Sequence, residues 1–336
     1  MKDATCMPQY PAKKFMSKTH EMLEAQLLYA GIELGVFNLL ESFVTLEEIE
    51  KGTGYHKRNL ELLLNALTAI GFIEKQSDAY RNLPETNFYL NQANGMYLGD
   101  HILYWRDMTS LDNLTHLVQN GPGKKQFKDE NGSDFFDFRS MGQGARTAMY
   151  LGQIQNFISA IERFYAKEQQ IKAFDLGCGS GIMAIELVKN FSGARATVFD
   201  QAHVIELTKE VICEYGVGDK VQTKQGNFNG YTFEESYDLI IASGVFDFVS
   251  DLKPMLLKLK DALEEDGHIY IGTHGINSDF TGPKPYILGW LSSHLNGLDI
   301  LKPDPLIREA LLDVGLEIVF EDEMGLRYIV RKRKTC

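Results

Sequence analysis

The sequence has 336 residues, of which 44% are hydrophobic and 24% charged, and its net charge at pH 7 is −12. This is the composition of an ordinary globular protein with room for two domains, so a mainly disordered chain is excluded. The acidic balance also disfavours a nucleic-acid partner, because neutralising phosphates requires clustered Lys and Arg side chains.

The sequence carries no targeting or redox signal. Its polar N-terminus does not resemble a signal peptide, and no apolar run approaches the roughly 18 residues of a transmembrane helix, so we expect a cytoplasmic protein without a membrane partner. The four cysteines (6, 178, 213 and 336) are scattered and form no CxxC pair. A disulfide framework and an iron–sulfur cluster are therefore both disfavoured.

Residues 1–165 are predicted to form a mainly helical domain. Residues 21–40 show helical hydrophobic spacing, and Thr45 precedes Glu48 by three residues, which is the spacing of a helix-capping box. Residues 59–71 predict a further amphipathic helix that ends at a glycine, and residues 72–83 alternate around a polar turn as a β-hairpin does. Helices followed by a hairpin in this order predict a winged helix.

A winged helix raises the possibility of DNA binding. Over residues 41–85 there are eight acidic and five basic side chains, which gives a net charge of 5 − 8 = −3. The candidate recognition helix carries leucines where a helix that contacts bases would carry Arg, Lys, Asn or Gln. The pattern favours an interaction surface for a second subunit over DNA binding.

Residues 166–336 are predicted to form an α/β domain. Short apolar β-rich runs alternate with helices at 181–191, 202–215, 251–265 and 304–313, which indicates a parallel sheet covered on both faces. The last two runs are separated by only a few residues, so they should form a hairpin with one antiparallel strand. The predicted strands occupy residues 171–176, 196–200, 220–224, 237–243, 268–273, 316–321 and 327–332.

The first of these strands runs directly into a glycine-rich turn. The turn reads Gly177-Cys178-Gly179-Ser180-Gly181, preceded by Asp175 in the strand. A dinucleotide site would have G-x-G-x-x-G, but the third glycine's position is taken by Ile182, and no Walker-type G-K-[ST] follows. The spacing therefore argues against a dinucleotide or a nucleoside triphosphate.

The next three strand ends offer groups suited to adenosine. Asp200 ends the second strand, where a carboxylate accepts hydrogen bonds from ribose hydroxyls. Asn227 and Phe228 follow the third strand and present an amide and an aromatic ring to an adenine base. Ser243 and Gly244 end the fourth strand, where small residues leave space for a ligand against the backbone. All lie at the carboxyl edge, where open α/β sheets bind ligands.

These motifs resemble those of a known enzyme family. The sequence FDLGCGSG…ATVFDQAHVIE…QGNFNG…YDLIIASGVFDF is similar to the class I methyltransferase core, and the first half resembles the winged-helix dimerisation domain of small-molecule O-methyltransferases. The resemblance covers about residues 17–331. It implies a Rossmann-like, seven-stranded, mostly parallel sheet with one antiparallel strand, preceded by the helical winged-helix domain. It also implies a homodimer through the N-terminal domain, a small-molecule acceptor, and S-adenosyl-L-methionine as the methyl donor.

The resemblance assigns a cofactor site residue by residue. Family contacts fall on Asp175, Gly177, Gly179, Asp200, Asn227, Phe228 and Ser243. Their neighbours in the same segments complete the predicted cofactor site: Cys178, Gly181, Gln201, Gly226 and Gly244.

The catalytic segment departs from the family pattern. O-Methylating members have a histidine after the fourth strand that deprotonates the acceptor hydroxyl, and Asp247 stands in its place here. An ordinary carboxylate is a poor base for a phenol, although an apolar pocket between Phe246 and Phe248 would strengthen it. Alternatively, Asp247 only caps the next helix or binds a backbone amide. His274, which follows the fifth strand on the ligand-bearing edge, is the other predicted catalytic residue.

The acceptor pocket is predicted from aromatic and sulfur-containing residues, which favour a flat apolar ligand. The predicted acceptor-binding residues are His101, Trp105, Met141, Tyr150, Trp290 and His294. No His, Asp or Glu set has metal-ligand spacing, so metal-free transfer is expected. The leading hypothesis is O-methylation of a small aromatic hydroxyl, with C- or N-methylation, or binding of the cofactor without methylation, as alternatives.

Overall fold

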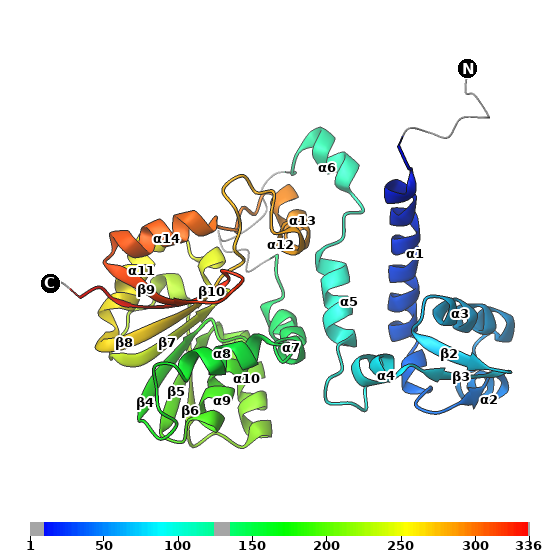
Figure 1. Cartoon of the computed structure of the whole chain (residues 1–336), viewed down its shortest axis with the longest axis horizontal. Coiled ribbons are helices and arrows are strands. Elements are labelled where there is room, and N and C mark those ends of the chain that lie inside the picture. The colour runs from blue at the N-terminus through cyan, green and yellow to red at the C-terminus, as the bar shows by residue number, and fades with distance from the viewer. Residues whose placement is uncertain (1–9, 124–134, 335–336) are drawn as a thin grey trace. The chain divides into compact units, whose positions relative to one another are not determined.

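The computed structural model describes residues 10–123 and 135–334, and the chain divides into two compact units, Met1–Leu103 and Tyr104–Cys336 (Figure 1). The predicted boundary between the two domains lies at residue 165, whereas the helices between residues 104 and 165 group with the second unit. The physical reason is packing: Phe157 of α8 (Gln153–Ile161) is fully buried in the core of that unit. Within the described ranges, no helix has the length and apolarity needed to cross a lipid bilayer.

The first unit is a helical domain with a small three-stranded sheet. The sheet order is β1-β3-β2, and the predicted hairpin is confirmed by antiparallel pairing of β2 with β3. Its elements are α1 (Lys13–Glu33), η1 (Val36–Asn38), β1 (Val44–Thr45), α2 (Leu46–Thr53), α3 (Lys57–Ala69), β2 (Ile73–Gln76), β3 (Ala79–Asn82) and α4 (Pro84–Leu90). Helix α5 (Gly99–Met108) crosses the division between the two units.

Local sequence patterns determine where these helices begin and which of their side chains are buried. Thr45 and Glu48 form the predicted capping box at the start of α2: the Thr45 side chain accepts from the Glu48 amide, and the Glu48 carboxylate accepts from the Thr45 amide at 2.9 Å. Three leucines of α3 are core residues: Leu64 and Leu67 are completely buried and Leu60 is 3% exposed, whereas Leu62 is 53% exposed. Their burial explains why this helix carries leucines instead of base-reading side chains.

The second unit is built on a seven-stranded sheet with the order β6-β5-β4-β7-β8-β10-β9. All pairs are parallel except those of β10, which runs antiparallel to both β8 and β9. The predicted antiparallel strand in a mostly parallel sheet is therefore confirmed. The strands are β4 (Ile171–Leu176), β5 (Ala194–Asp200), β6 (Val221–Gln225), β7 (Tyr237–Ser243), β8 (Leu263–Gly272), β9 (Leu316–Glu321) and β10 (Arg327–Lys332).

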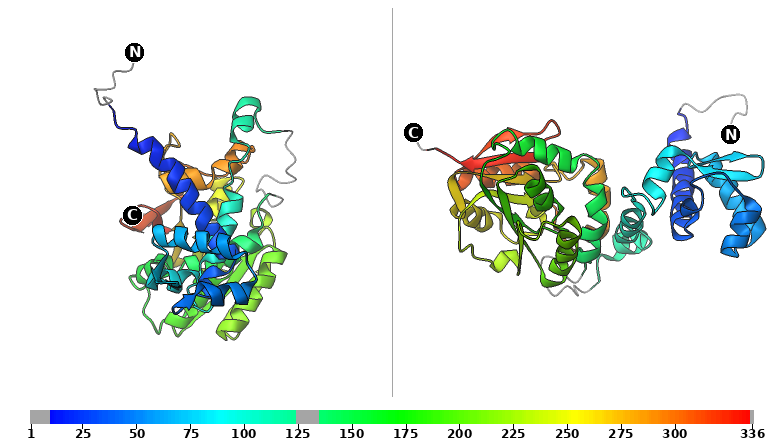
Figure 2. Two further views of the ribbon diagram at one scale, coloured as in Figure 1. Left: turned by 90° about the vertical axis from the view of Figure 1, so that its right-hand side faces the viewer. Right: turned by 90° about the horizontal axis from the view of Figure 1, so that it is seen from below.

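Helices cover both faces of this sheet (Figure 2). Successive residues of β4 point to opposite faces. Ala173 therefore joins the core beneath α8 and α9 (Ile182–Asn190), and Phe174 joins the core beneath α11 (Leu252–Asp261) and α14 (Asp304–Asp313). The remaining helices of the unit are α6 (Leu114–Asn120), α7 (Phe138–Ala148), α9 (Ile182–Asn190), α10 (Ala202–Tyr215), η2 (Phe228–Gly230), η3 (Phe246–Phe248), α11 (Leu252–Asp261), α12 (Lys284–Gly289), α13 (Leu291–Leu295) and α14 (Asp304–Asp313).

One predicted boundary was wrong. A helix was expected over 251–265 and a strand over 268–273, but α11 ends at Asp261 and β8 begins at Leu263. The early part of β8 pairs Leu263 with Tyr237, and the register then shifts so that His268 pairs with Leu239. A strand irregularity of this kind interrupts the alternation on which the sequence prediction depends.

Candidate active site

The glycine-rich turn after β4 has a backbone that only glycine adopts without strain. Gly177, Gly179 and Gly181 have φ angles of 66°, 55° and 75°. At Gly177 a Cβ atom would also lie 2.6 Å from Val245 Cγ2, so a side chain is excluded there by contact as well as by conformation. Helix α7 lies against the same turn, because a Cβ atom on Gly142 would come within 3.3 Å of the Ser180 amide nitrogen. The glycine-rich turn thus packs closely against both Val245 and α7.

Asp200, at the end of β5, is bound to this turn. Its Oδ2 accepts a hydrogen bond from the Gly179 amide at 2.9 Å, and its Oδ1 accepts from the Gln201 amide at 2.7 Å. Burial raises the pKa of Asp200, and the two amides oppose that rise. A carboxylate has about four acceptor positions. The two amides therefore leave capacity for hydroxyl donors of a ligand.

Asp175 lies near the end of β4, just before the glycine-rich turn, and its carboxyl group is buried. It is 3% exposed, and in the described part of the chain its Oδ2 is buried without a hydrogen-bond partner. Burial, together with the negative charge of Asp200, raises the pKa of Asp175 to about 8. A buried, unpartnered carboxylate is costly unless a cation or donor meets it. This orphaned oxygen fits the positively charged ammonium end of S-adenosylmethionine.

A cavity of about 330 Å³ lies over the turn, within the second unit. This volume falls in the range of small-molecule sites, roughly 300–1,000 Å³. Predicted cofactor residues and predicted acceptor residues line the same cavity. Those predicted residues are Trp105, Met141, Asp175, Gly177, Cys178, Gly179, Asp200, Gln201, Phe228, Ser243, Gly244, His274 and Trp290.

Three of the predicted cofactor residues, Gly181, Gly226 and Asn227, are not among the residues that line this cavity. Gly181 is the N-cap of α9. Gly226 leaves room for the Phe199 ring, which a Cβ atom at that position would approach to 2.8 Å. Asn227 accepts a hydrogen bond from the Asn229 amide through its side-chain oxygen at 3.0 Å and so caps η2. Their cofactor contacts stay predictions.

Three predicted acceptor residues lie outside the cavity lining. His101 belongs to the part of α5 within the first unit. The Tyr150 hydroxyl donates to Glu186 Oε1 at 2.7 Å. His294 lies in α13 with its Nδ1 3.5 Å from Asp299 Oδ1, and burial lowers its pKa. Their contact with an acceptor stays a prediction.

The two predicted catalytic residues come together. Nδ1 of His274 lies 2.6 Å from Oδ2 of Asp247, although 27 positions separate them in the sequence. Asp247 is 5% exposed, and the His274 side chain is 18% exposed and lines the cavity. An Nδ1–H donated to a carboxylate leaves Nε2 of a neutral imidazole as the acceptor. The pair therefore has the arrangement of an oriented general base.

The other side of Asp247 is fixed by the loop before α14. Its Oδ1 accepts from the Lys302 amide at 3.2 Å, and the Lys302 ammonium donates to the Asp247 carbonyl at 3.0 Å. Asp247 thus binds a backbone amide, as one alternative required, but it also contacts His274, and Asp251 rather than Asp247 caps α11. Its catalytic role stays a prediction. Both carboxylate oxygens of Asp247 have partners, so the histidine it holds has a defined orientation.

Aromatic rings lie beside His274. Trp290 is the centre of the cluster, and His274 also contacts Tyr286, with ring centroids 4.8 Å apart. The rings around Trp290 lie 5.6–5.9 Å away in edge-to-face geometry and belong to Trp105, Phe136, Phe248 and His274. Such walls select flat apolar ligands.

Some residues of the site were not identified from the sequence. The Gln153 amide donates to the Ser243 hydroxyl at 3.2 Å and lines the cavity, as do Gly142 and Met183. Nothing in their local sequence distinguishes them, because they enter the site only through packing of α7, α8 and α9 on the turn. Among the described residues, no three His, Cys, Asp or Glu side chains are grouped as metal ligands would be.

Comparison with known proteins agrees with this geometry. Residues 174–269 match a family model described as a methyltransferase domain, and residues 17–92 match the O-methyltransferase dimerisation domain. The chain is 26% identical over 269 residues to 3-hydroxy-5-methyl-1-naphthoate 3-O-methyltransferase of Streptomyces sahachiroi, covering 77% of this chain and 76% of that protein.

Solved structures share the fold over nearly the whole chain. An O-methyltransferase family protein from Burkholderia thailandensis superposes with a TM-score of 0.80 at 15% identity, covering 98% of this chain and 99% of that one. Human N-acetylserotonin methyltransferase, in complex with S-adenosylmethionine, gives a TM-score of 0.76 at 19% identity, covering 99% of this chain and 100% of that one.

Fold, site and domain matches together define an S-adenosylmethionine-dependent methyltransferase. Within that class, the chain belongs to the O-methyltransferase family that carries an N-terminal dimerisation domain.

Proposed function

We propose that this protein methylates the hydroxyl group of a small, flat, aromatic acceptor and that His274 is the general base. The observation that carries the proposal is the 2.6 Å contact between His274 Nδ1 and Asp247 Oδ2 at the wall of the cavity. The relative from Streptomyces sahachiroi is named for O-methylation of a hydroxynaphthoate, which supports an acceptor of that chemical class.

The donor side of the cavity suits S-adenosylmethionine group by group. The orphaned Oδ2 of Asp175 would meet the ammonium, Asp200 would accept from the ribose hydroxyls, and Phe228 would face the adenine. Bound there, the cofactor supplies a methyl group on a positively charged sulfur, and the transfer leaves a neutral thioether. The protein's own contribution is to hold the donor and the acceptor in register, which by itself supplies several kcal/mol.

The acceptor side suits proton removal from an aromatic hydroxyl. Asp247 fixes the tautomer of His274 and stabilises the imidazolium that forms when Nε2 takes the hydroxyl proton. Trp290 and Tyr286 both contact the histidine ring and would give the acceptor an apolar wall. In this protein the histidine stands after β8 and the carboxylate occupies the place of the family histidine after β7.

We also propose a homodimer formed through the first unit. Helix α1 exposes a stripe of large apolar side chains in the single chain, and residues seven apart lie on one helix face. The exposed fractions are 73% for Phe15, 60% for Met16, 54% for Met22 and 48% for Leu23. Most of this helix falls within the matched dimerisation domain.

A panel of acceptors tests the proposed reaction. The protein is incubated with S-adenosylmethionine and 3-hydroxy-5-methyl-1-naphthoate, N-acetylserotonin or 2-naphthol, with 2-naphthylamine as the amine matched to 2-naphthol, and products are identified by mass spectrometry. Methyl ethers of the hydroxyl compounds are expected. Methylation of the amine in preference to 2-naphthol, or no methylated product from any acceptor, would contradict the proposal. The best hydroxyl substrate of this panel is called the panel acceptor below.

A further inference from the structure

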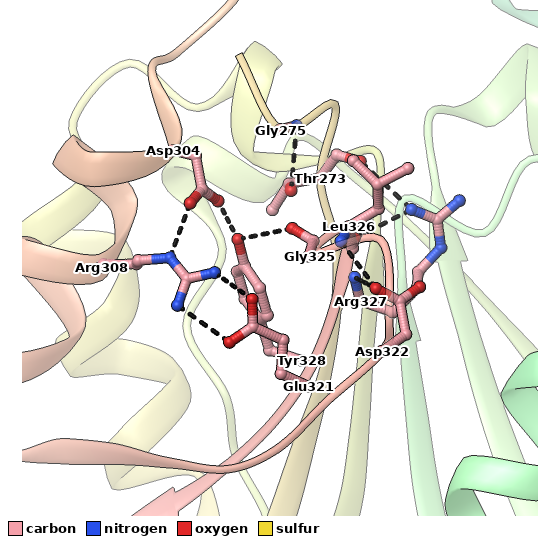
Figure 3. Close-up of polar contacts among 10 residues, drawn as sticks. All are labelled: Thr273, Gly275, Asp304, Arg308, Glu321, Asp322, Gly325, Leu326, Arg327 and Tyr328. Carbon is pink, nitrogen blue, oxygen red and sulfur yellow. Dashed lines mark hydrogen bonds and ion pairs between the residues drawn. The ribbon is translucent and has the colours of Figure 1, made fainter. Parts of the chain in front are cut away.

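The segment that carries His274 has no helix or strand to hold it. Residues 273–275 leave the end of β8 without regular structure, so the position of the imidazole depends on contacts to neighbouring elements. The turn between β9 and β10 supplies them (Figure 3). The Thr273 amide donates to the Leu326 carbonyl at 2.9 Å, which attaches the residue before the histidine to this turn.

The Arg327 side chain donates hydrogen bonds to the backbone of both segments, the one that carries His274 and the turn between β9 and β10. Its Nη1 donates to the Thr273 carbonyl at 3.2 Å and to the Leu326 carbonyl at 2.9 Å, as Figure 3 shows. One guanidinium nitrogen thus holds a carbonyl of the His274 segment and a carbonyl of the turn. Hydrogen bonds from a charged donor are roughly twice as strong as neutral ones, and the planar guanidinium is preorganised for such contacts.

The residue after the histidine is held by packing. Gly275 has a φ of +59°, and a Cβ atom there would lie 2.5 Å from Leu326 Cδ2, so the leucine side chain lies directly against the glycine. The turn itself is closed by Asp322, whose Oδ1 accepts from the Leu326 amide at 2.8 Å and from the Arg327 amide at 3.3 Å. Leu326 and Arg327 therefore hold the backbone on both sides of His274.

A second set of contacts ties the same turn to α14. The Tyr328 hydroxyl donates to Asp304, whose carboxylate also accepts from Arg308, and the Asp304 amide donates to the Ile276 carbonyl at 2.8 Å. Figure 3 shows the Tyr328, Asp304 and Arg308 side chains on the opposite side of the turn from the Arg327 guanidinium. The segment 273–276 is thus attached at both of its ends.

We infer that Arg327 is a positioning residue for His274: by holding the Thr273 carbonyl it keeps the imidazole in the geometry of the Asp247 pair. The inference rests on the proposed function, because it assumes that His274 is the base. Misplacement of a catalytic group by about 1 Å costs on the order of 100-fold in rate. Loss of the guanidinium should therefore lower turnover without touching the donor site.

The test compares Arg327→Gln with Arg331→Gln. Both arginines lie on β10, but the Arg331 side chain donates to Glu317 Oε1 at 2.8 Å instead of to the backbone around His274. Arg327→Gln is expected to lower kcat for the panel acceptor about 10- to 100-fold, with the Kd for S-adenosylhomocysteine unchanged. Arg331→Gln should leave both values unchanged. Equal kcat values for the two variants would overturn the inference.

A double variant separates positioning from general destabilisation. If Arg327 acts through His274, Arg327→Gln should cause no further loss of kcat in a His274→Asn background, since coupled residues are not additive. A full additional loss in that background would overturn the inference. Should Arg327→Gln not fold, Arg327→Met serves in both comparisons, because its long aliphatic side chain has no donor for the Thr273 and Leu326 carbonyls.

The same measurements distinguish the inference from the proposed function. If His274→Asn alone retains wild-type turnover, the proposed function fails and the inference fails with it. If His274→Asn is inactive while Arg327→Gln is fully active, only the inference fails.

Discussion

Nδ1 of His274 lies 2.6 Å from Oδ2 of Asp247, and the two residues follow the carboxyl ends of the neighbouring strands β8 and β7. The parallel pairing of β7 with β8 is what brings them together. A carboxylate alone would be a weak base for a phenol, but a histidine oriented by a carboxylate is a common solution to that problem. In the proposed mechanism Asp247 orients the base, which is not among the roles predicted for it from the sequence.

The orienting role of Asp247 predicts the effect of Asp247→Asn. The amide cannot stabilise the imidazolium and can favour the wrong tautomer of His274, so kcat for the panel acceptor should fall about 100-fold or more. The Kd for S-adenosylhomocysteine, measured by calorimetry, should change little. The matched control is Asp251→Asn, at the N-cap of α11, which should keep wild-type kcat. Equal activity of the two variants would remove Asp247 from the mechanism.

The exchange variant Asp247→His/His274→Asp extends this test. It keeps a histidine and a carboxylate in contact while moving the histidine to the position where the family carries it. We expect it to recover at least about tenfold of the kcat lost in His274→Asp alone, because the pair is restored as a unit. No recovery in a folded double variant would mean that the two residues do not act as an exchangeable pair.

Much of this architecture could be predicted from local sequence. The capping box at Thr45, the glycine-rich turn after β4 and the position of Asp200 all follow from short-range rules that need no tertiary contact. The contact between Asp247 and His274 could not be predicted in the same way, because it depends on strand neighbours and on the Lys302 amide. Gly142 and Gln153 were missed for a similar reason, since only the packing of α7 and α8 brings them to the cavity.

Tyr150 and Asn227 show that residue type alone does not predict the direction in which a polar side chain points. Their residue types suit the roles predicted for them, yet the Tyr150 hydroxyl binds Glu186 and the Asn227 side chain caps η2. Residue type and approximate position do not specify where a polar side chain points. Only a partner within hydrogen-bond distance does, and that partner can be far away in sequence.

Asp175 predicts how donor binding depends on pH. Burial raises the pKa of Asp175 to about 8, so its carboxyl group must lose a proton when a ligand ammonium binds beside it. Binding should therefore strengthen as pH rises from 6 to 8, by up to about tenfold per pH unit, and level off above about 8. Calorimetry with S-adenosylhomocysteine in buffers of different ionisation enthalpy should detect proton release at pH 7.

Two variants control for other titrating groups. Asp175→Asn should bind S-adenosylhomocysteine weakly and with no pH slope between 6 and 8. Asp219→Asn, just before the amino end of β6 and so away from the carboxyl ends of the strands, should keep the wild-type dependence of binding on pH. A slope that persists in Asp175→Asn would assign the proton to another group.

Trp290 predicts a separation between acceptor and donor binding. Removing its ring in Trp290→Leu opens the aromatic cluster, so the KM for the panel acceptor should rise about tenfold, in line with the loss of several ring contacts worth about 0.5–1.5 kcal/mol each. Affinity for S-adenosylhomocysteine should be retained. Phe191→Leu, in the core that contains α9, should lower the free energy of unfolding and leave the KM unaltered. A KM change of the same size in both variants would contradict the assignment.

The α1 stripe predicts a loss of dimerisation on adding charge. Met22→Asp/Leu23→Asp should convert a dimer into a monomer in sedimentation velocity, because carboxylates cannot be buried unpaired in an apolar interface. The control is Leu312→Asp on α14, a leucine that is 60% exposed and lies outside the matched dimerisation domain. A dimer that survives the α1 substitutions would place the interface elsewhere.

The most direct test of the account is the turnover of His274→Asn with S-adenosylmethionine and the panel acceptor. The asparagine amide can still donate to Asp247, but the base Nε2 is gone, so kcat should fall about 100- to 10,000-fold while the Kd for S-adenosylhomocysteine stays at its wild-type value. His268→Asn, in the middle of β8 beside Tyr165, is the matched control and should keep wild-type kcat. Wild-type turnover by His274→Asn would show that this histidine does not take the proton.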